Sequence, residues 1–402
     1  MLSFFLVQNT LLLSNVAFFK DAMIQSFTSR EVYIAFNMLD QIGPVRARKL
    51  IAALGSPEAV FTASPETIAR IPGFGRELVN TICTGRVAVD PIAEEKKAEK
   101  LGIRLVTFID PEYPAALKEI HDPPLVLYIK GRITAADQHA IAIVGTRHAT
   151  HYGASVADRL TYGLSKAGFT IVSGLARGID TVAHRAAIKA GGRTLAVLGG
   201  AIDKMYPPEN EELAEAITAQ GAVISEYPLG RSPDRQTFPY RNRIVAGISM
   251  TGIVVVEAGE KSGAVITANT ASEQGRNVFA VPGRIDNPAA RGCHALIKQG
   301  AKLVETIDDI LDDVHMLLPK HVEKKAEAMR AMPDLQLTGE EAEVVKALGG
   351  GGLQVDELSR ACNLNAARLN SLLLGLEMKR VVKVLPGRQV ELRDGLAVAR
   401  KD

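Results

Sequence analysis

The sequence contains few cysteines and almost no excess charge. Its three cysteines, Cys83, Cys293 and Cys362, stand far apart, and their spacing matches neither a metal-binding motif nor a disulfide framework. This usage is typical of a reducing compartment, so we expect a cytoplasmic protein. The formal net charge of +2 is too small for the whole chain to attract a polyanion. Any binding to nucleic acid must therefore come from a local basic patch.

Long hydrophobic runs are missing as well. The apolar residues near the start, 2–7 and 11–13, are interrupted by polar side chains, and no Lys or Arg precedes them. A secretory signal needs a basic start, and a membrane span needs about 20 consecutive apolar residues. We therefore expect residues 1–28 to form a disordered extension, with Met23 as an alternative natural start, and we expect no membrane partner.

The sequence also lacks the motifs of common cofactors and metal ions. No Gly-x-Gly-x-x-Gly motif follows the first predicted strand at residues 141–144, and Lys261 lacks the glycine spacing of a phosphate-binding P-loop. The scattered histidines have no Cys or Asp at ligand spacing. We expect neither a cofactor nor a bound metal ion.

The length of 402 residues predicts two to four domains. Residues 29–105 have a helical pattern interrupted by two apolar-glycine turns, at 42–45 and 71–75. Such turns are typical of a helix-hairpin-helix (SAM-like) domain, whose turn N–H groups can contact a phosphate backbone without reading its sequence. A small helical domain that uses Gly-Pro turns only as helix caps fits the pattern equally well. Residues 106–139 are rich in proline and are expected to be a connecting segment.

From residue 140 to residue 315, apolar strands alternate with helical segments. Continuous runs of Val, Ile, Leu and Ala are typical of a parallel sheet that is buried on both faces, so we predict an α/β domain with a Rossmann-like parallel sheet core. The strands are expected at residues 141–144, 170–172, 194–198, 222–225, 252–257, 277–281 and 302–304.

The last part of the chain begins with a charged stretch, residues 316–335, which is expected to be a linker. Residues 336–395 then contain three helical segments, followed by two short strands joined by Pro386-Gly387-Arg388. This order predicts a C-terminal winged-helix domain.

The segment from Ser173 to Asp180 is the most informative part of the sequence. Its residues, Ser-Gly-Leu-Ala-Arg-Gly-Ile-Asp, lie between an apolar strand and a helical pattern. The backbone N–H groups of such a turn, beside the guanidinium of Arg177, suit an anion and most often a phosphate. Asp180 and His184 are spaced for an acid–base pair. We expect instead that Asp180 caps the helix and that His184 makes a local contact.

The carboxyl ends of the other predicted strands carry further candidates, because ligands of a doubly wound sheet bind at that edge. The cations expected there are Arg147, Arg177, Lys204, Arg235, Arg241 and Arg243. Aromatic rings lie among them in the sequence, at Tyr206, Phe238 and Tyr240. Rings beside cations suit stacking on unpaired bases, although rings also fill cores. We predict an electropositive site, and the alternative is a solvated surface on which the arginines are paired with carboxylates.

Several of these motifs, in their order and spacing, resemble those of one family. They include Gly-Thr-Arg at 145–147, the Ser173–Asp180 segment, Phe-Pro-Tyr-Arg-Asn-Arg at 238–243 and Ala-Val-Pro-Gly at 280–283. The resemblance is to the DNA-processing protein A family (DprA, also called Smf). It implies a protein that binds single-stranded DNA without sequence specificity and loads the RecA recombinase in natural transformation and DNA uptake. It also implies a homodimer formed through the Rossmann-like domain, and no catalysis.

The strand ends and the resemblance together imply a set of DNA-binding residues in the Rossmann-like domain. They come from the loops after the strands and from the segment around residue 240. The set is Gly145, Thr146, Arg147, Ser173, Gly174, Arg177, Gly178, Lys204, Arg235, Phe238, Arg241, Asn242, Arg243, Ser262 and Thr267.

Two other functions are weighed against this one. Glu257, Gly263 and Thr267 resemble the layout of cytokinin-activating phosphoribohydrolases, which would make the chain a nucleotide-processing enzyme. The third hypothesis is a regulatory module that works through the winged helix. The expected recognition helix of that domain, residues 366–375, contains a single arginine, Arg368. We therefore expect it to contact a protein or to bind DNA weakly, since base reading needs more side chains.

Overall fold

The computed structural model describes residues 27–39, 41–314, 339–349, 351–378, 381–385 and 387–392. The chain divides into two compact units, Met1–Ala326 and Glu327–Asp402. The expected extension lies outside the described residues up to position 26, and the expected linker at 316–335 lies outside them entirely.

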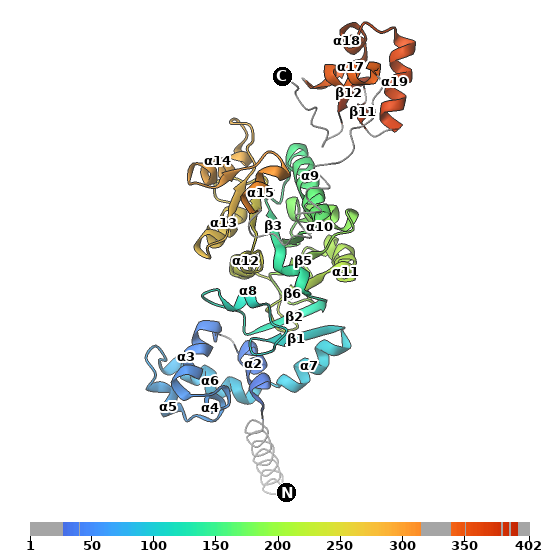
Figure 1. Cartoon of the computed structure of the whole chain (residues 1–402). Helices are drawn as coiled ribbons and strands as arrows, with labels where there is room; N and C mark the ends of the chain where they lie inside the picture. The colour runs from blue at the N-terminus through green and yellow to red at the C-terminus, as the bar shows by residue number, and fades with distance from the viewer. Residues whose placement is uncertain are drawn as a thin grey trace, which may run out of the picture. The chain divides into compact units, whose positions relative to one another are not determined.

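The first unit is built on a nine-stranded sheet with the order β1-β2-β6-β5-β4-β3-β7-β8-β9 (Figure 1). Strands β3 to β9 are parallel and lie where the sequence predicts them, which confirms the Rossmann-like core. Continuous apolar runs allow these strands to be buried on both faces. Their bounds are β3 Ala140–Val144, β4 Thr170–Ser173, β5 Thr194–Val197, β6 Ala222–Ser225, β7 Gly252–Val255, β8 Val278–Ala280 and β9 Lys302–Leu303.

The segment described from sequence as a connection, residues 106–139, contributes to the sheet. Strand β2 (Val126–Gly131) pairs antiparallel with β6, with Tyr128 opposite Ser225, and β1 (Ile103–Thr107) pairs antiparallel with β2. The apolar run 125–129 is buried. The prolines that precede this run suggested an irregular connection. They lie only in the turn before it, and the buried run itself forms a strand.

Helices cover both faces of the sheet. On one face α9, α10 and α11 contact one another, and on the other face α12, α13 and α14 do so (Figure 1). The bounds of these helices are α9 His151–Ala167, α10 Ile179–Lys189, α11 Glu211–Gln220, α12 Thr237–Ile248, α13 Gly263–Glu273 and α14 Arg291–Lys298. The shorter elements are α8 Ala115–Lys118, η1 Ala135–His139, η2 Pro208–Asn210, η3 Pro288–Ala290 and α15 Ile307–Val314.

The N-terminal helices pack on the β1–β2 edge of this sheet. Phe36 and Phe61 share one apolar core with Val126 and Tyr128. The two glycine turns precede α3 and α6, which begin after Gly43 and Gly75 without a side-chain cap. The helices are α2 Ser29–Met38, α3 Pro44–Leu54, α4 Pro57–Thr62, α5 Pro65–Ala69, α6 Arg76–Ala88 and α7 Pro91–Lys100.

The described residues of the second unit form three helices and a small sheet with the order β10-β12-β11. The three helices and the strands β11 and β12 agree with the winged-helix prediction, and β10 is an additional short strand. The bounds are α17 Gly339–Leu348, β10 Leu353–Gln354, α18 Val355–Ala361, α19 Ala366–Met378, β11 Val382–Leu385 and β12 Gln389–Leu392.

Two features are absent from the described part of the chain. None of its helices combines the length and the apolar character needed to cross a bilayer. Nor does it contain a group of three or more His, Cys, Asp or Glu side chains arranged to hold a metal ion.

A buried carboxylate joins the helical region to the sheet. Glu94 of α7 accepts hydrogen bonds from Tyr128 Oη at 3.0 Å and from Leu229 N at 2.8 Å. We predict that Tyr128→Phe destabilises the fold by about 1–3 kcal/mol, because it removes a partner from a buried polar group. Chemical denaturation followed by circular dichroism measures the change.

Tyr152→Phe is the matched control. Tyr152 also donates its hydroxyl to a protein oxygen, Pro282 O, but its side chain is exposed. The control should change stability by less than about 0.5 kcal/mol. Equal stability of the two variants would show that the Glu94 bond contributes nothing.

Candidate functional site

The site lies at the carboxyl ends of the parallel strands, where the strand order reverses. Strand β3 has β4 on one side and β7 on the other, so its carboxyl end opens the crevice in which such sheets bind ligands. The loop after β3 is joined to its neighbours through Thr146, whose N–H donates to Glu257 O at 2.7 Å and whose carbonyl accepts from Ile179 N at 3.2 Å. The predicted loops therefore meet at one place.

The glycine turn after β4 is held by protein groups rather than left open. Gly174 N and Ala176 N donate to Asp180 Oδ2 at 3.1 Å and 3.3 Å. These two N–H groups are therefore engaged, and the prediction of a cradle with free N–H groups is corrected at these positions. Asp180 caps this loop and not the start of α10, because its carboxylate reaches back to the turn that precedes the helix.

Arg241 is internal, contrary to its expected place at the ligand. Its side chain rises from α12 beneath the turn, and the residue is 5% exposed. The guanidinium donates from Nη1 to Gly174 O at 2.9 Å and also to Val197 O. Burial lowers the pKa of Arg241, and the opposite charge of Asp180 counters this effect. The long side chain follows the buried face of α12, a placement that residue type alone does not reveal.

Arg243 is also internal, because two carboxylates hold it. It donates to Asp122 Oδ2 at 2.9 Å and to Glu226 Oε2 at 2.6 Å, and its guanidinium carbon lies 4.0 Å from the centre of the Tyr240 ring. Burial works to lower the pKa of Arg243, but Glu226 and the other acidic neighbours outweigh it and raise the pKa. The expectation that Arg243 faces the ligand is corrected for this reason.

Several smaller predicted residues also serve the interior. Ser173 Oγ donates to Ile143 O at 2.6 Å, and Thr267 Oγ1 donates to Gly263 O at 2.9 Å. Asn242 is buried beside Arg241 and accepts a hydrogen bond from its Nε at 3.2 Å. Ser262 caps α13 by accepting from Val265 N. These side chains shape the loops and have no exposed polar surface comparable to that of the outer arginines.

Four side chains form a continuous row, which we name the ring–arginine row: Arg147, Phe238, Tyr206 and Arg177. Phe238 is half-buried, and the other three are exposed. The Arg147 guanidinium lies 5.0 Å from the Phe238 ring centre, and the Phe238 and Tyr206 rings are 5.8 Å apart. The Arg177 guanidinium lies 5.6 Å from the Tyr206 ring. Lys204 and Arg235, from adjoining loops, are exposed as well. The structure thus brings together two of the predicted cations with two of the predicted rings.

Glu209 is a functional candidate that sequence reasoning missed. It forms an ion pair with Arg177, and the Arg177 hydrogen bond lowers the pKa of the Glu209 carboxyl. Both side chains are about half exposed, so the pair is a surface contact that another anion can replace. The sequence offers one indication of this role, the position of Glu209 shortly after Tyr206-Pro207, and no motif includes the residue.

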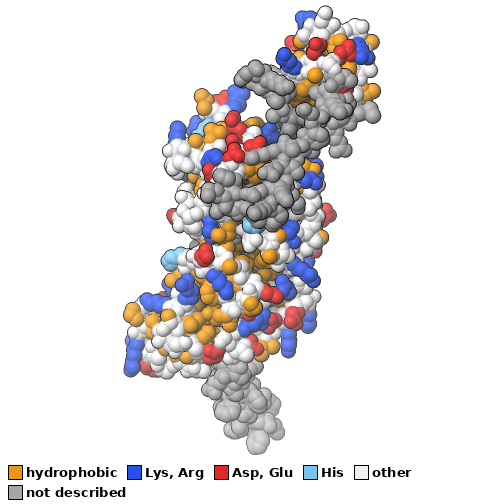
Figure 2. Space-filling model, viewed as in Figure 1, with side chains coloured by type: hydrophobic (Ala, Val, Ile, Leu, Met, Phe, Trp, Pro, Cys, Tyr) orange, Lys and Arg blue, Asp and Glu red, His pale blue; other side chains and the backbone are white. Residues whose placement is uncertain are grey.

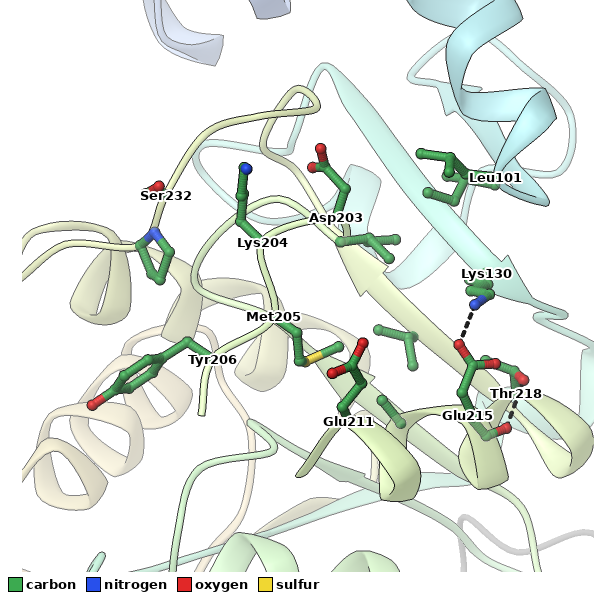
Figure 3. A pocket seen from close by; sticks show the side chains of 15 residues that line it. Leu101, Lys130, Asp203, Lys204, Met205, Tyr206, Glu211, Glu215, Thr218 and Ser232 are labelled. Carbon is green, nitrogen blue, oxygen red and sulfur yellow. Dashed lines mark hydrogen bonds and ion pairs between the residues drawn. The ribbon is translucent and has the colours of Figure 1, made fainter. Parts of the chain in front are cut away.

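A pocket of about 580 Å³ lies beside Lys204 and has a mixed charge. Its lining includes the carboxylates of Asp203, Glu211 and Glu215 (Figure 3). The Tyr206 ring extends away from Glu211 and Glu215, towards the other side of its loop (Figure 3). On the face shown in Figure 2, Lys and Arg side chains are likewise interspersed with Asp and Glu. A polyanion is therefore favoured along the ring–arginine row rather than in this pocket.

The residues considered for catalysis are engaged elsewhere. His184 is fully buried, its Nδ1 lies 2.7 Å from Thr194 Oγ1, and burial lowers its pKa to about 3. The predicted local contact of His184 is confirmed. Glu257 is 2% exposed and accepts from Thr150 N at 2.9 Å and from Thr150 Oγ1 at 2.8 Å, at the start of α9. His184 Nε2 has no hydrogen-bond partner but lies in the protein interior, and both Glu257 oxygens accept hydrogen bonds from Thr150.

Comparisons with known proteins agree with these motifs. The family described as DNA recombination-mediator protein A matches residues 104–315, and the DprA winged helix domain matches residues 328–388. The SAM-like helix-hairpin-helix tandem matches residues 35–85.

Individual relatives extend the match. Protein Smf of Synechocystis sp. is 39% identical over 283 residues, which is 69% of this chain and 71% of the relative. DNA processing protein DprA of Bacillus subtilis is 45% identical over 214 residues, which is 53% of this chain and 72% of the relative. The X-ray structure of DNA processing protein A from Streptococcus pneumoniae superposes with a TM-score of 0.61 at 35% identity, over 71% of this chain and 98% of that one.

The tight packing around Gly174 leads to a prediction. A Cβ added there would lie 2.6 Å from the guanidinium carbon of Arg241, which is buried and bonded. Gly174→Ala should therefore destabilise the fold by about 1–3 kcal/mol through overpacking. Thermal or chemical denaturation measures the change. The control is Gly263→Ala, where an added Cβ meets nothing within 4 Å, and unchanged stability of both variants would contradict the packing argument.

Proposed function

Because the chain belongs to the DNA recombination-mediator protein A family (DprA/Smf), we propose that it binds single-stranded DNA without sequence specificity and assists the RecA recombinase. The observation that supports this most is the ring–arginine row. It combines two exposed cations with an exposed ring, Tyr206, and a half-buried ring, Phe238, on one edge of the sheet.

The rings favour single strands over duplex. Each base of a duplex is covered by its neighbours, whereas an unpaired base can stack on an aromatic side chain, with a contribution of roughly 1–3 kcal/mol. Every base has such a face, so the contact does not depend on sequence. In this proposal, Arg147 and Arg177 at the two ends of the row would contact phosphates that flank the stacked bases. A mononucleotide would use only part of this row.

Further predicted residues take two different roles in this proposal. Lys204 and Arg235 are exposed and would extend the phosphate contacts. Gly145, Thr146 and Gly178 would bring the protein backbone close to the DNA strand. The buried residues Ser173, Gly174, Asn242, Arg243 and Thr267 and the half-buried Ser262 would support the loops from within, as would Arg241.

The partners belong to the proposal as well. We propose an action with RecA on DNA taken up during natural transformation, in the cytoplasm. The family description as a recombination mediator supports the role in recombination. We also propose a homodimer through the Rossmann-like domain, as the family resemblance implies.

The winged helix suits a protein contact better than base reading. The single arginine of α19, Arg368, donates to Glu340 Oε2 at 2.9 Å, so this helix has one cation to offer a phosphate and a half-exposed carboxylate competes for it. Leu374 on the same helix is 61% exposed, and Val384 on the wing is exposed too. An uncharged helix face with an exposed leucine gives little attraction for phosphates.

A nucleotide-processing enzyme finds no support in the site. The carboxylate of Glu257 is held by Thr150, and the Thr267 hydroxyl is bonded to Gly263 O. The layout that resembled a phosphoribohydrolase is therefore occupied by contacts within the protein.

The proposal predicts a salt-dependent affinity for single strands. Arg147→Ala should weaken binding to oligo-dT and reduce the slope of log K against log salt by about 0.7, the value for one lost phosphate contact on a single strand. Fluorescence anisotropy with a labelled oligonucleotide at several salt concentrations gives both quantities. Unlabelled duplex should compete poorly.

Arg104→Ala provides the control for a change of charge. Arg104 is an exposed arginine on the edge strand β1, paired with Glu112. This variant should bind like the wild type. A flat salt dependence of the wild type, or equal binding of duplex and single strand, would overturn the proposed function.

Glu209→Gln should strengthen binding. In the free protein the Glu209 carboxylate holds Arg177, and a phosphate has to displace it. Because exposed ion pairs contribute at most about 1 kcal/mol, the gain should be no more than roughly fivefold. The salt slope should become steeper by up to one contact. Glu112→Gln, in the turn that follows β1, is the matched control because Glu112 pairs with Arg104. A loss of affinity in Glu209→Gln would contradict the competition.

A further inference from the structure

We infer that Arg241 is a positioning residue for the DNA site. Its buried guanidinium holds the turn from Gly174 to Gly178 in the shape that presents Arg177, and Arg241 itself does not contact DNA. The inference rests on the proposed function, because it concerns the site at which single-stranded DNA is proposed to bind.

The backbone of Gly174 is held on both sides by buried side chains. Its carbonyl accepts from Arg241 Nη1 at 2.9 Å, and its N–H donates to Asp180 Oδ2 at 3.1 Å. Both polar groups of one residue are thus bonded to buried side chains of opposite charge. Arg241 also donates to Val197 O at the end of β5. The turn is therefore fastened to the neighbouring strand end from beneath.

The turn from Gly174 to Gly178 is also connected to the ring–arginine row. The next carbonyl, Leu175 O, accepts from Asn210 Nδ2 at 2.9 Å, and Asn210 adjoins Glu209, the partner of Arg177. Leu175 has a φ of 54°, which a non-glycine residue adopts only when its surroundings hold it there. At the other end of the turn, Ile179 N donates to Thr146 O, next to Arg147. The turn that Arg241 holds at Gly174 is thus bonded to the residues beside both ends of the row.

The shape of the guanidinium is the reason that position 241 needs an arginine. The planar guanidinium reaches two carbonyl oxygens through Nη1 and the Asn242 side chain through Nε. A lysine ammonium carries the same charge but lacks this rigid fork. If Arg241 acted by charge alone, a lysine at this position would preserve DNA binding. If Arg241 acts by holding the turn, a lysine will not preserve it.

The test uses the full-length chain with Arg241→Lys, Arg241→Met and, as the comparator for a direct contact, Arg147→Ala. Binding of labelled oligo-dT is measured by anisotropy over a series of salt concentrations. Hydrogen–deuterium exchange of the backbone at residues 173–180 is followed in the free protein. We expect both Arg241 variants to bind roughly tenfold more weakly at every salt concentration, because the turn has to be ordered on binding. Their salt slope should equal that of the wild type, and residues 173–180 should exchange faster.

Several results would overturn the inference. They are wild-type affinity in Arg241→Lys, a reduced salt slope in Arg241→Met like that of Arg147→Ala, or unchanged exchange at residues 173–180 in both variants. Should Arg241→Met fail to fold, Arg241→Lys decides the question through affinity and exchange. If the wild type does not bind oligo-dT at all, the proposed function fails, and the exchange measurement still determines whether Arg241 holds the turn.

Discussion

The arrangement of the site depends on how one residue, Gly174, is held between two buried charges. Arg241 bonds its carbonyl and Asp180 bonds its N–H, so the turn after β4 is fixed before any ligand arrives. A side chain at this position would collide with the guanidinium. The shape of the turn places Arg177 next to Tyr206, and the connection through Thr146 places the Arg147 loop on the other side. The exposed chemistry therefore rests on an internal electrostatic contact.

The structure also explains how a chain with a net charge of only +2 can present a basic site. The cations around the strand ends are divided between the interior and the surface. Arg241 and Arg243 are bonded to carbonyl and carboxylate oxygens inside the protein. Arg147 remains exposed beside a ring, and Arg177 is countered by Glu209. Attraction of DNA then depends on a few exposed side chains, and salt screens such a local patch readily.

Sequence reasoning succeeded where the pattern is local. The seven parallel strands lie at the predicted residues because each is a continuous apolar run bounded by turns, and His184 makes the predicted local contact. The prediction was wrong for β2, because the prolines in the preceding turn suggested a connecting segment although the run 125–129 is buried. It also failed for Arg241 and Arg243, because a sequence gives the charge of an arginine but not the direction of its side chain. The pairing of Glu209 with Arg177 spans 32 positions and leaves no local pattern.

The amino-acid sequence by itself determined the class of fold, the order of the parallel strands along the chain and the edge of the sheet at which a ligand is expected. These follow from hydrophobic periodicity and from the rule that ligands of such sheets lie at the carboxyl ends of the strands. Only the tertiary structure decided which cations face solvent and which N–H groups are already engaged. The reason is that burial and hydrogen bonding join residues distant in the chain, as when Arg241 of α12 meets Gly174 after β4.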